Sequence, residues 1–353
     1  MLVAALVSAQ TVPPEVPTGF AAVQFVDAQH GWLAGAGGVW ATADGGASWH
    51  QQAAADEAYY QVAALDAQHV WVGGEHGLLH TADGGAHWER TLADQGATLR
   101  LSIVAPGQGY VVVADSAGAR AGRLLTTEDA GATWHARPTP TPVQALCFES
   151  RARGWISEGT AVWRTDDGGA SWTTVFTMPT AAAAGGGPAP GFRAELACGG
   201  DGVVWALFET PGGMSQVGWA LYRTPDAGAT WTPLAASAQF FPATGVPRTH
   251  GGWSRVGLAA VDQATAYVLG VCAACSLPGT QELGTVSLAV SRDAGADWEV
   301  LPPVPDLSGP AALQTLPQAS FIGLDNGWLV AASADRRLWT TRDGGRSWQV
   351  QTP

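Results

Sequence analysis

Four glutamates are the residues of this sequence best suited to acid–base chemistry. Hydrolysis of a glycosidic bond needs two carboxyl groups roughly 5–10 Å apart, one to protonate the leaving group and one to act as base or nucleophile. The candidates are Glu75, Glu158, Glu195 and Glu209. In a chain with 30 acidic residues, ordinary solvated charge is the competing interpretation. A hydrolase therefore stays an alternative and is not the leading hypothesis.

A sialidase-like hydrolase would also need an arginine cluster for its substrate's carboxylate and a tyrosine nucleophile. Arg100, Arg193 and Arg255 could form the cluster. Tyr110 and Tyr267 fall at a repeated position that we expect to be buried, and the Arg-Ile-Pro stretch typical of sialidases is missing from the sequence. Glycan binding without hydrolysis is a further alternative.

A second set of candidates lies in the segment around Trp253, which contains large aromatic and basic residues. Tryptophan and arginine are favoured anchors of protein interfaces, so we expect this segment to contact a partner. The alternative is that its aromatic residues only pin their own loop to the protein. The candidates are Phe241, Arg248, His250, Trp253 and Arg255.

Four cysteines suit an exported protein that can form disulfides. Cys272 and Cys275 lack a second Cys or His pair at zinc-site spacing, and no helix start is evident beside them for redox chemistry. We expect them to form a small disulfide ring that stiffens their loop. Cys147 and Cys198 fall at about the same position of the first strand in neighbouring repeats, and we expect them to be buried thiols. A bridge between them stays open, and it would need Cα atoms closer than about 7 Å. We expect no metal or cofactor.

One eight-residue phrase occurs seven times and decides the architecture. It reads Ser/Thr-x-Asp-x-Gly-x-x-Trp, at residues 42–49, 81–88, 127–134, 165–172, 224–231, 291–298 and 341–348. Asp favours a tight turn because its carboxylate accepts backbone N–H bonds, and Gly permits conformations that a side chain would obstruct. We expect the aspartates to fasten turns rather than to bind metal or act as acids. They are Asp44, Asp83, Asp129, Asp167, Asp226, Asp293 and Asp343.

Around each phrase stand four short apolar runs separated by Gly, Asp and Gln-His turns, which is the pattern of strands. In the first repeat we expect strands a to d near residues 21–26, 31–35, 38–43 and 47–51. Four-stranded antiparallel units repeated at about 40 residues or more close most simply as a propeller. The sequence therefore predicts an all-β, seven-bladed β-propeller in which the phrase forms each c–d turn.

The tryptophans support this register, since all but Trp219 and Trp253 of the 17 fall in recurrent positions. Strand b carries an aromatic residue at one equivalent position in every repeat, and this position predicts the core. Its occupants are Trp32, Trp71, Tyr110, Trp155, Trp205, Tyr267 and Trp328.

We expect residues 1–10 to be the remnant of a secretory signal, because MLVAALVSAQ is apolar and ends in small residues before Gln10. Residues 11–353 then form a single propeller. Its blades are expected at about 20–52, 59–91, 98–137, 143–176, 193–235, 255–301 and 317–353, each contiguous in sequence, so the ring closes without sharing a blade.

The phrase is similar to the Asp-box, or bacterial-neuraminidase, repeat. With Asp27, Gly31 and Trp32 before it, and again with Asp325 and Gly327, it resembles the photosystem II stability and assembly factor family. The resemblance implies a non-catalytic, exported seven-bladed propeller that holds a partner protein during assembly. Sialidases, xyloglucanases and sortilin-type receptors also use Asp-boxes. Two boxes depart from the usual Ser/Thr, with His87 and Asp297.

The strand order separates two faces. The a–b and c–d turns form one, which we call the box face, and the b–c and d–a connections form the other, the insertion face. All the large insertions are expected on the insertion face, where loops on a rigid scaffold can carry binding specificity. They are residues 173–193, 232–254, 299–318, 114–122, 210–218 and 272–284.

One position near the start of strand a is expected to form a ring at the mouth of the central channel. The ring is polar and mixed in sign, and Arg193 and Arg255 lie near it. It could bind a peptide terminus or a small anion, or it could simply be solvated. Its members are Ala22, Gln61, Arg100, Gln144, Glu195, Gly257 and Gln318.

Composition narrows the partners. The net charge is −13, and all 17 basic residues are Arg. Such an acidic surface repels nucleic acid and anionic lipid heads, and no apolar run is long enough for a membrane span. We expect an exported, monomeric, non-catalytic scaffold that binds a protein partner, or else a glycan, through its insertion face.

Overall fold

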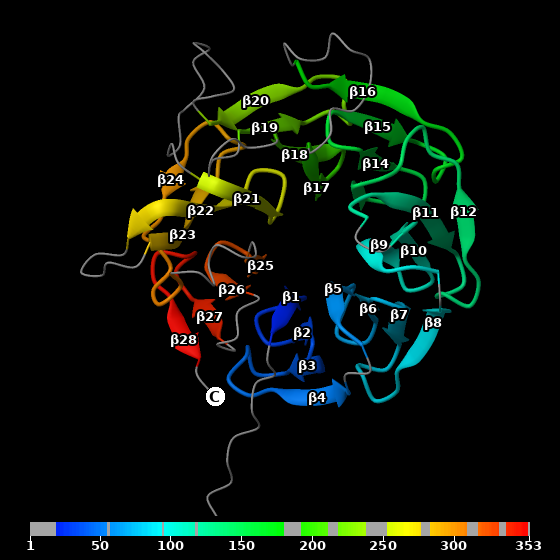
Figure 1. Cartoon of the computed structure of the whole chain (residues 1–353), viewed down its shortest axis with the longest axis horizontal. Helices are drawn as coiled ribbons and strands as arrows, with labels where there is room; N and C mark the ends of the chain where they lie inside the picture. Colours follow the sequence, from blue (N-terminus) through cyan, green and yellow to red (C-terminus); the bar gives the residue numbers. More distant parts are fainter. Residues whose placement is uncertain are drawn as a thin grey trace, which may run out of the picture.

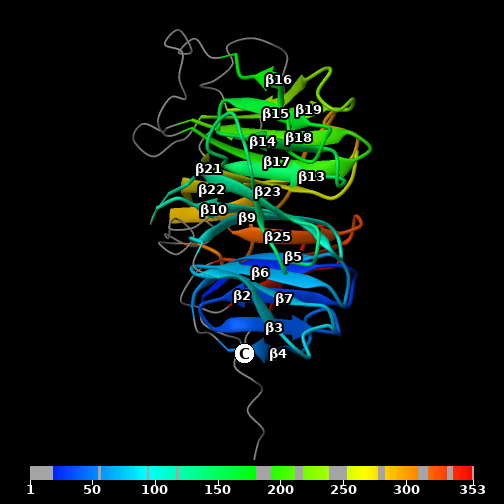
Figure 2. The same ribbon diagram turned by 90° about the vertical axis from the view of Figure 1, so that its right-hand side faces the viewer.

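A computed structural model shows seven antiparallel sheets arranged as blades around a central channel (Figure 1). It describes residues 19–54, 57–93, 95–116, 119–179, 192–210, 218–237, 253–276, 283–308, 317–331 and 337–351, with backbone alone at 254–255, 273–276 and 283. The predicted seven-bladed β-propeller is confirmed. Viewed from the side in Figure 2, the blades form a disc with two faces.

Each blade consists of four strands that follow one another in the chain. Blade one contains β1 (Phe20–Phe25), β2 (Gly31–Gly35), β3 (Gly38–Thr42) and β4 (His50–Ala53). Blade two contains β5 (Tyr59–Ala64), β6 (Val70–Gly74), β7 (Gly77–Thr81) and β8 (Glu89–Ala93). Blade three contains β9 (Thr98–Ala105), β10 (Gln108–Ala114), β11 (Gly122–Thr127) and β12 (His135–Arg137). Blade four contains β13 (Ala145–Phe148), β14 (Gly154–Ser157), β15 (Ala161–Thr165) and β16 (Thr173–Thr177).

The remaining three blades have the same order. Blade five contains β17 (Arg193–Gly200), β18 (Val203–Glu209), β19 (Trp219–Thr224) and β20 (Thr232–Ala236). Blade six contains β21 (Trp253–Ala260), β22 (Ala266–Ser276), β23 (Leu283–Ser291) and β24 (Glu299–Val300). Blade seven contains β25 (Gln318–Ile322), β26 (Asn326–Val330), β27 (Leu338–Thr341) and β28 (Gln349–Gln351). Strand d begins one residue after each box tryptophan, later than the sequence predicts for blade one.

Strand a of each blade lines the channel, and strand d lies at the circumference (Figure 1). The a–b and c–d turns therefore meet on one face, and the b–c and d–a connections meet on the other. The middle parts of the predicted insertions lie outside the described residues. In the part of the chain that the structure describes, no helix has the length and apolarity needed to span a bilayer.

The aromatic residues of strand b form the core, as predicted. All seven are nearly inaccessible, from 3 % exposure at Trp32 to 0 % at Trp71. The box tryptophans differ among themselves: Trp49 and Trp348 are buried, while the other five are half-buried at the outer edge of the blades. Burial of an aromatic residue removes roughly 150–250 Å² from water, so the strand-b position stabilises the packing of every blade.

The ring closes through side chains between blades one and seven. The ring of Phe25 in β1 stacks on Trp328 in β26 at a centroid distance of 3.5 Å, and the Trp328 indole donates to the Gly45 carbonyl at 2.9 Å. The same kind of stack joins Phe148 to Tyr110, between blades four and three. The closing contact thus repeats an ordinary contact between blades, which explains how the ring closes without a shared sheet.

The innermost strands have one edge without a strand partner, and neighbouring blades satisfy part of it. An unpaired backbone N–H away from water is costly, so such edges need acceptors. The Ser320 hydroxyl accepts from the Phe25 N–H at 3.0 Å, and the Gln24 side-chain oxygen accepts from the Ala64 N–H at 3.1 Å. Polar residues of strand a therefore hold adjacent blades together beside the channel.

Each Asp-box is a closed set of hydrogen bonds, as blade one shows. The Thr42 hydroxyl donates to Asp44 Oδ1 at 2.7 Å and accepts from the Gly46 N–H at 2.9 Å. Asp44 Oδ1 also accepts from the Ser48 N–H at 2.9 Å. The Trp49 indole donates to the Gly46 carbonyl at 3.1 Å. The three bonds of the Ser/Thr hydroxyl and the Asp carboxylate recur in all seven boxes.

The residue after each box aspartate adopts a left-handed conformation. Glycine occupies this position in four boxes, but Ala130, Ala227 and Ala294 occupy it at φ 58°, 58° and 63°. A left-handed conformation costs a non-glycine residue roughly 1–2 kcal/mol. The hydrogen bonds of the box outweigh this cost, because the turn keeps its geometry in all seven repeats.

Asp297 makes the box of blade six incomplete. In blade five the Thr230 hydroxyl donates to Asp226 Oδ2 at 2.6 Å, whereas Asp297 offers Asp293 only its backbone N–H, at 3.0 Å. The hydroxyl of Thr133 is the first cause that lowers the pKa of Asp129 to about 2 in blade three. In blade six a second carboxylate stands where that donor is expected.

A disulfide joins the innermost strands of blades four and five. Cys147 in β13 is bonded to Cys198 in β17, with Cα atoms 5.7 Å apart. The expectation that both are free thiols is therefore wrong: equivalent positions of adjacent strands come within bridging distance here. By loop-closure entropy, a crosslink spanning 51 residues stabilises the fold by about 4 kcal/mol.

Replacing Asp297 by Ser should stabilise the protein. The variant Asp297→Ser supplies the missing hydroxyl donor and removes one of two adjacent negative charges, so the melting temperature should rise by about 1–3 °C. The matched control is Thr230→Asp, which should lower it. Differential scanning calorimetry decides: an unchanged or lower melting temperature for Asp297→Ser would refute this account of the box.

Candidate functional site

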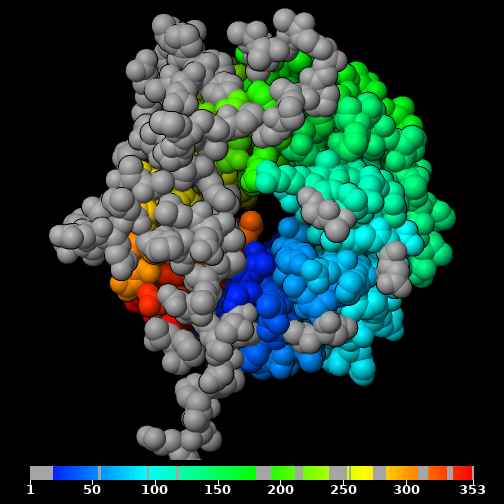
Figure 3. Space-filling model, in the orientation of Figure 1, coloured from blue at the N-terminus to red at the C-terminus, as the bar shows by residue number. Residues whose placement is uncertain are grey.

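The central channel opens on the insertion face, where Figure 3 shows the hollow bordered by the blue, cyan and green blades. Beside it lies a cavity of about 260 Å³ between blades three and five. We call this cavity the mouth. Its charged and polar lining residues are Arg100, Arg120, Gln144, Arg193, Glu195 and Glu209.

The residues of the predicted ring line two cavities beside the central channel, with one exception. A second cavity, of about 180 Å³, lies across the channel and is lined by Gln61, Arg100, Glu195, Gly257 and Gln318. Gln144 lines the mouth. Ala22, the remaining member, is buried. Arg100 and Glu195 line both cavities, so they form the centre of the site.

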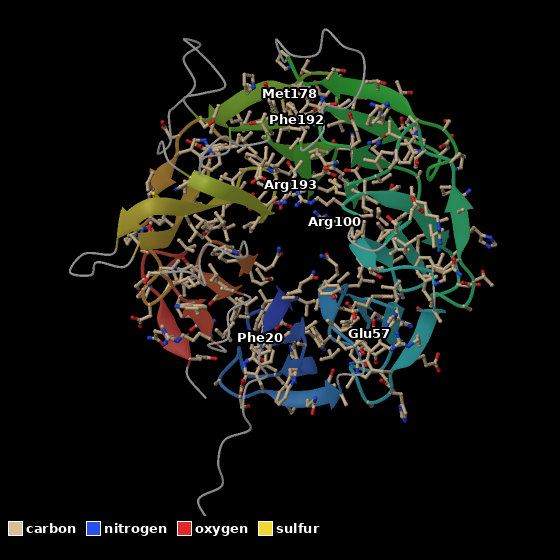
Figure 4. All side chains as sticks on the ribbon, viewed as in Figure 1. Phe20, Glu57, Arg100, Met178, Phe192 and Arg193 are labelled. Atoms are coloured by element: carbon tan, nitrogen blue, oxygen red, sulfur yellow. A yellow bond between two sulfur atoms is a disulfide. The ribbon has the colours of Figure 1, made fainter. Side chains whose placement is uncertain are left out.

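Three arginines and two glutamates line the mouth, and two of these arginines come from the strands at the channel. Arg100 comes from β9 and Arg193 from the start of β17, and Figure 4 places both at the wall of the channel. The Arg100 guanidinium donates to the Leu99 carbonyl at 2.7 Å. Among the described residues, neither arginine forms a direct ion pair, but the Glu195 carboxylate lies close enough to interact with the charges of both. Burial lowers the pKa of Arg100; the Glu195 carboxylate opposes this effect, and the charge of Arg193 adds to it. The site can therefore bind an anionic group that shares these two cations.

Glu195 and Glu209 form hydrogen bonds that join two blades. Glu195 Oε2 accepts from the Leu258 N–H at 2.8 Å, and Glu209 Oε1 accepts from the Val256 N–H at 2.9 Å. Both bonds join blade five to the free edge of β21 in blade six. Burial raises the pKa of Glu195, against the opposing effect of Arg100. These carboxylates hold two blades together while they line the mouth.

The other two candidate carboxylates also have local partners. Glu75 accepts a hydrogen bond from the Tyr60 phenol; burial first and this bond second raise the pKa of Tyr60 to about 12. Glu158 is buried, accepts from the Thr160 hydroxyl, and has one oxygen without a partner. Neither lines the mouth.

Trp253 is placed differently from its predicted role as a surface anchor. It is 2 % exposed and stacks on Trp219 at a centroid distance of 5.7 Å, within the core of blades five and six. The two tryptophans outside the repeated positions thus pack against each other. This placement agrees with the alternative interpretation, in which the aromatic residues of this segment pin it to the protein. The Arg255 side chain, and the whole of Phe241, Arg248 and His250, lie outside the described residues.

No group of three or more His, Cys, Asp or Glu residues in the described ranges could hold a metal ion. Cys272 is disulfide-bonded. The side chain of Cys275, its predicted partner, falls outside the described part, so this pairing remains a prediction. The seven box aspartates are occupied by their own turns, as expected.

Arg120 is a site residue that the sequence reasoning missed. It lies in the b–c connection of blade three and is exposed in the mouth. The sequence signal for Arg120 is its position in segment 114–122, one of the insertions predicted on the insertion face.

The fold and the boxes define this protein as a seven-bladed Asp-box β-propeller. A family model described as photosynthesis system II assembly factor YCF48 matches residues 5–142. This match confirms the resemblance that the repeats indicated. None of the curated protein sequences matches the chain.

Solved structures of this fold cover nearly the whole chain. YCF48 bound to D1 peptide is 18 % identical, with a TM-score of 0.58 and coverage of 94 % of this chain and 93 % of that one. YCF48 from Cyanidioschyzon merolae is 17 % identical, with a TM-score of 0.59 and coverage of 94 % and 96 %. The GH74 xyloglucanase from Xanthomonas campestris is 17 % identical, with a TM-score of 0.60 and coverage of 95 % and 55 %. At these identities the likeness establishes the fold.

Truncating Trp253 should destabilise the protein rather than remove a surface contact. Because the side chain is buried against Trp219, Trp253→Ala should lower the free energy of unfolding by about 3–5 kcal/mol, measured by urea denaturation. Leu324→Ala, at an exposed position on the box face, serves as control and should change little. Equal stability of the two variants would contradict the core placement of Trp253.

Proposed function

We propose that this chain is a non-catalytic, exported propeller that binds a segment of a partner protein at its mouth, as an assembly scaffold. The observation that carries the proposal is the pair of arginines in the mouth of a strongly acidic protein, Arg100 and Arg193. Among the described residues neither forms a direct ion pair, and they share the charge of one nearby carboxylate, Glu195. The segment that fits carries an acidic side chain or a terminal carboxylate, because a guanidinium pair favours a carboxylate.

The comparisons support this choice of ligand. The family model describes an assembly factor, and one solved relative is described as bound to a peptide. The volume of the mouth, about 260 Å³, suits one or two side chains better than a folded domain. A peptide segment therefore agrees with both the charge and the size of the site.

Export agrees with the chemistry of the cysteines. Disulfides persist in oxidising compartments and are rare in reducing ones. The bridge between Cys147 and Cys198 lies in the innermost strands, where it ties two blades together. This placement supports an exported protein, in agreement with the apolar N-terminal sequence.

A glycoside hydrolase is the alternative, since a GH74 enzyme shares the fold. The chain covers 55 % of that enzyme's length. Glu195 and Glu209, the carboxylates in the mouth, each accept a backbone N–H of β21. Because these hydrogen bonds hold blades five and six together, they favour a binding site over a catalytic site. A panel of chromogenic glycosides distinguishes the two: turnover that Glu195→Gln abolishes would support the hydrolase, and a glycan array would reveal a sugar-binding module.

Selection from a phage library of random linear peptides tests the proposal directly. Peptides retained by the wild-type protein should be enriched in Asp, Glu or a free C-terminal carboxylate. The variant Arg100→Gln/Arg193→Gln should weaken their binding at least about tenfold, since it removes both cations. The control is Arg151→Gln, at an exposed arginine on the box face.

The outcome is decisive in both directions. Loss of binding in the mouth variant, with binding kept in Arg151→Gln and an unchanged melting temperature for both, supports the mouth as the site. Absence of acidic enrichment, or equal binding by the double variant, would remove it.

A further inference from the structure

A groove on the insertion face runs outward from the mouth between blades two and three. It has a volume of about 840 Å³, within the range of sites that enclose several residues of a ligand. Arg100 lines the groove, the mouth and the channel cavity alike. Leu99 and Ala119 line both the groove and the mouth. The groove therefore adjoins the mouth, and Arg100 lies at their common border.

Two β-bulges supply the apolar walls of the groove. In blade two the register between β5 and β6 shifts between Tyr59 and Gln61, so Tyr60 is the extra residue. In blade three it shifts between Thr98 and Arg100, and Leu99 is the extra residue. Bulges re-aim side chains next to binding sites. Tyr60 and Leu99 both line the groove, one from each wall.

The walls are held in place before any ligand arrives. Arg123 pairs with Asp115 at 3.3 Å and donates to the Gln95 carbonyl at 2.9 Å, which ties the outer part of the groove together. The phenol of Tyr60 is bonded to Glu75 and has a pKa raised to about 12 by burial and by that bond. Tyr60 nevertheless stays 36 % exposed. A rigid wall lowers the entropy lost on binding.

Glycine is required at one position of the groove lining, Gly96. It has φ 108°, and a Cβ there would come within 2.2 Å of the Ala114 carbonyl oxygen. A side chain at this position would be strained and would clash with the protein's own backbone. The lining of the groove at Gly96 is therefore main chain, held close to Ala114.

We infer that the groove binds the continuation of the partner segment, with an aromatic or aliphatic side chain seated between Tyr60 and Leu99 on one side of the acidic residue held at Arg100. This inference rests on the proposed function. It adds the direction in which the bound segment runs and the order of its acidic and apolar residues. The mouth selects a negative charge, and the groove selects an apolar side chain at a fixed spacing from that charge. The partner is an extended acidic–apolar peptide segment.

The test is an array of synthetic Gly/Ser peptides that carry one Asp and one Phe, with the Phe moved along the chain on either side of the Asp. Binding of each labelled peptide is measured by fluorescence anisotropy. Phe should strengthen binding about tenfold at one narrow spacing and on one side only. Tyr60→Ser should abolish that gain and leave the dependence on Asp intact.

Two variants serve as controls. Tyr60→Phe keeps the ring and should keep the gain, whereas Leu324→Ser removes an exposed apolar residue on the box face and should have no effect. Dependence on Asp without any preferred Phe position, or a Phe gain that survives Tyr60→Ser in a folded protein, would overturn the inference and leave the proposed function standing. No dependence on Asp would remove the proposed function itself.

Discussion

The hydrogen-bonded Asp-box is the interaction on which the rest of this structure depends. One carboxylate and one hydroxyl satisfy the backbone of a tight turn, and the same set of bonds occurs in all seven blades. The turn survives even where alanine replaces glycine at a left-handed position. Because this network occupies the c–d turns, the long insertions are confined to the opposite face. The division between a fixed face and a variable face follows from this chemistry.

The channel wall shows how one residue can serve both scaffold and site. Innermost strands have a free edge, and side chains of the neighbouring blade supply acceptors to it, as Ser320 and Gln24 do. Glu195 continues that pattern in blade five, yet it also stands in the mouth beside Arg100. Its bond to the Leu258 N–H fixes one carboxylate oxygen, and the carboxylate interacts with the charges of both Arg100 and Arg193. The electrostatics of the mouth are therefore set by the way the blades are joined.

Much of the fold could be predicted from the sequence because its signals repeat. The box, the aromatic position of strand b and the ring position of strand a each occur once in all seven repeats. The repeats can therefore be aligned with one another, which fixes where each strand lies. Predictions failed where a residue occurs once. The sequence around Trp253 is typical of a surface anchor, but in the structure Trp219 stacks on Trp253. The separation of Cys147 and Cys198 depends on the distance between adjacent blades, which no spacing in the chain reports. The bulges that present Tyr60 and Leu99 also leave no periodic signal.

The central claim is that hydrogen bonding fixes the box face, and that the insertion face is free to vary and to bind. An insertion scan tests it most directly, with the same short Gly-Ser insert placed in every connection on both faces and thermal unfolding measured for each variant. The account predicts a large loss of melting temperature for inserts within the boxes and small losses for inserts in the b–c and d–a connections. Equal losses on both faces, or greater tolerance within the boxes, would contradict it.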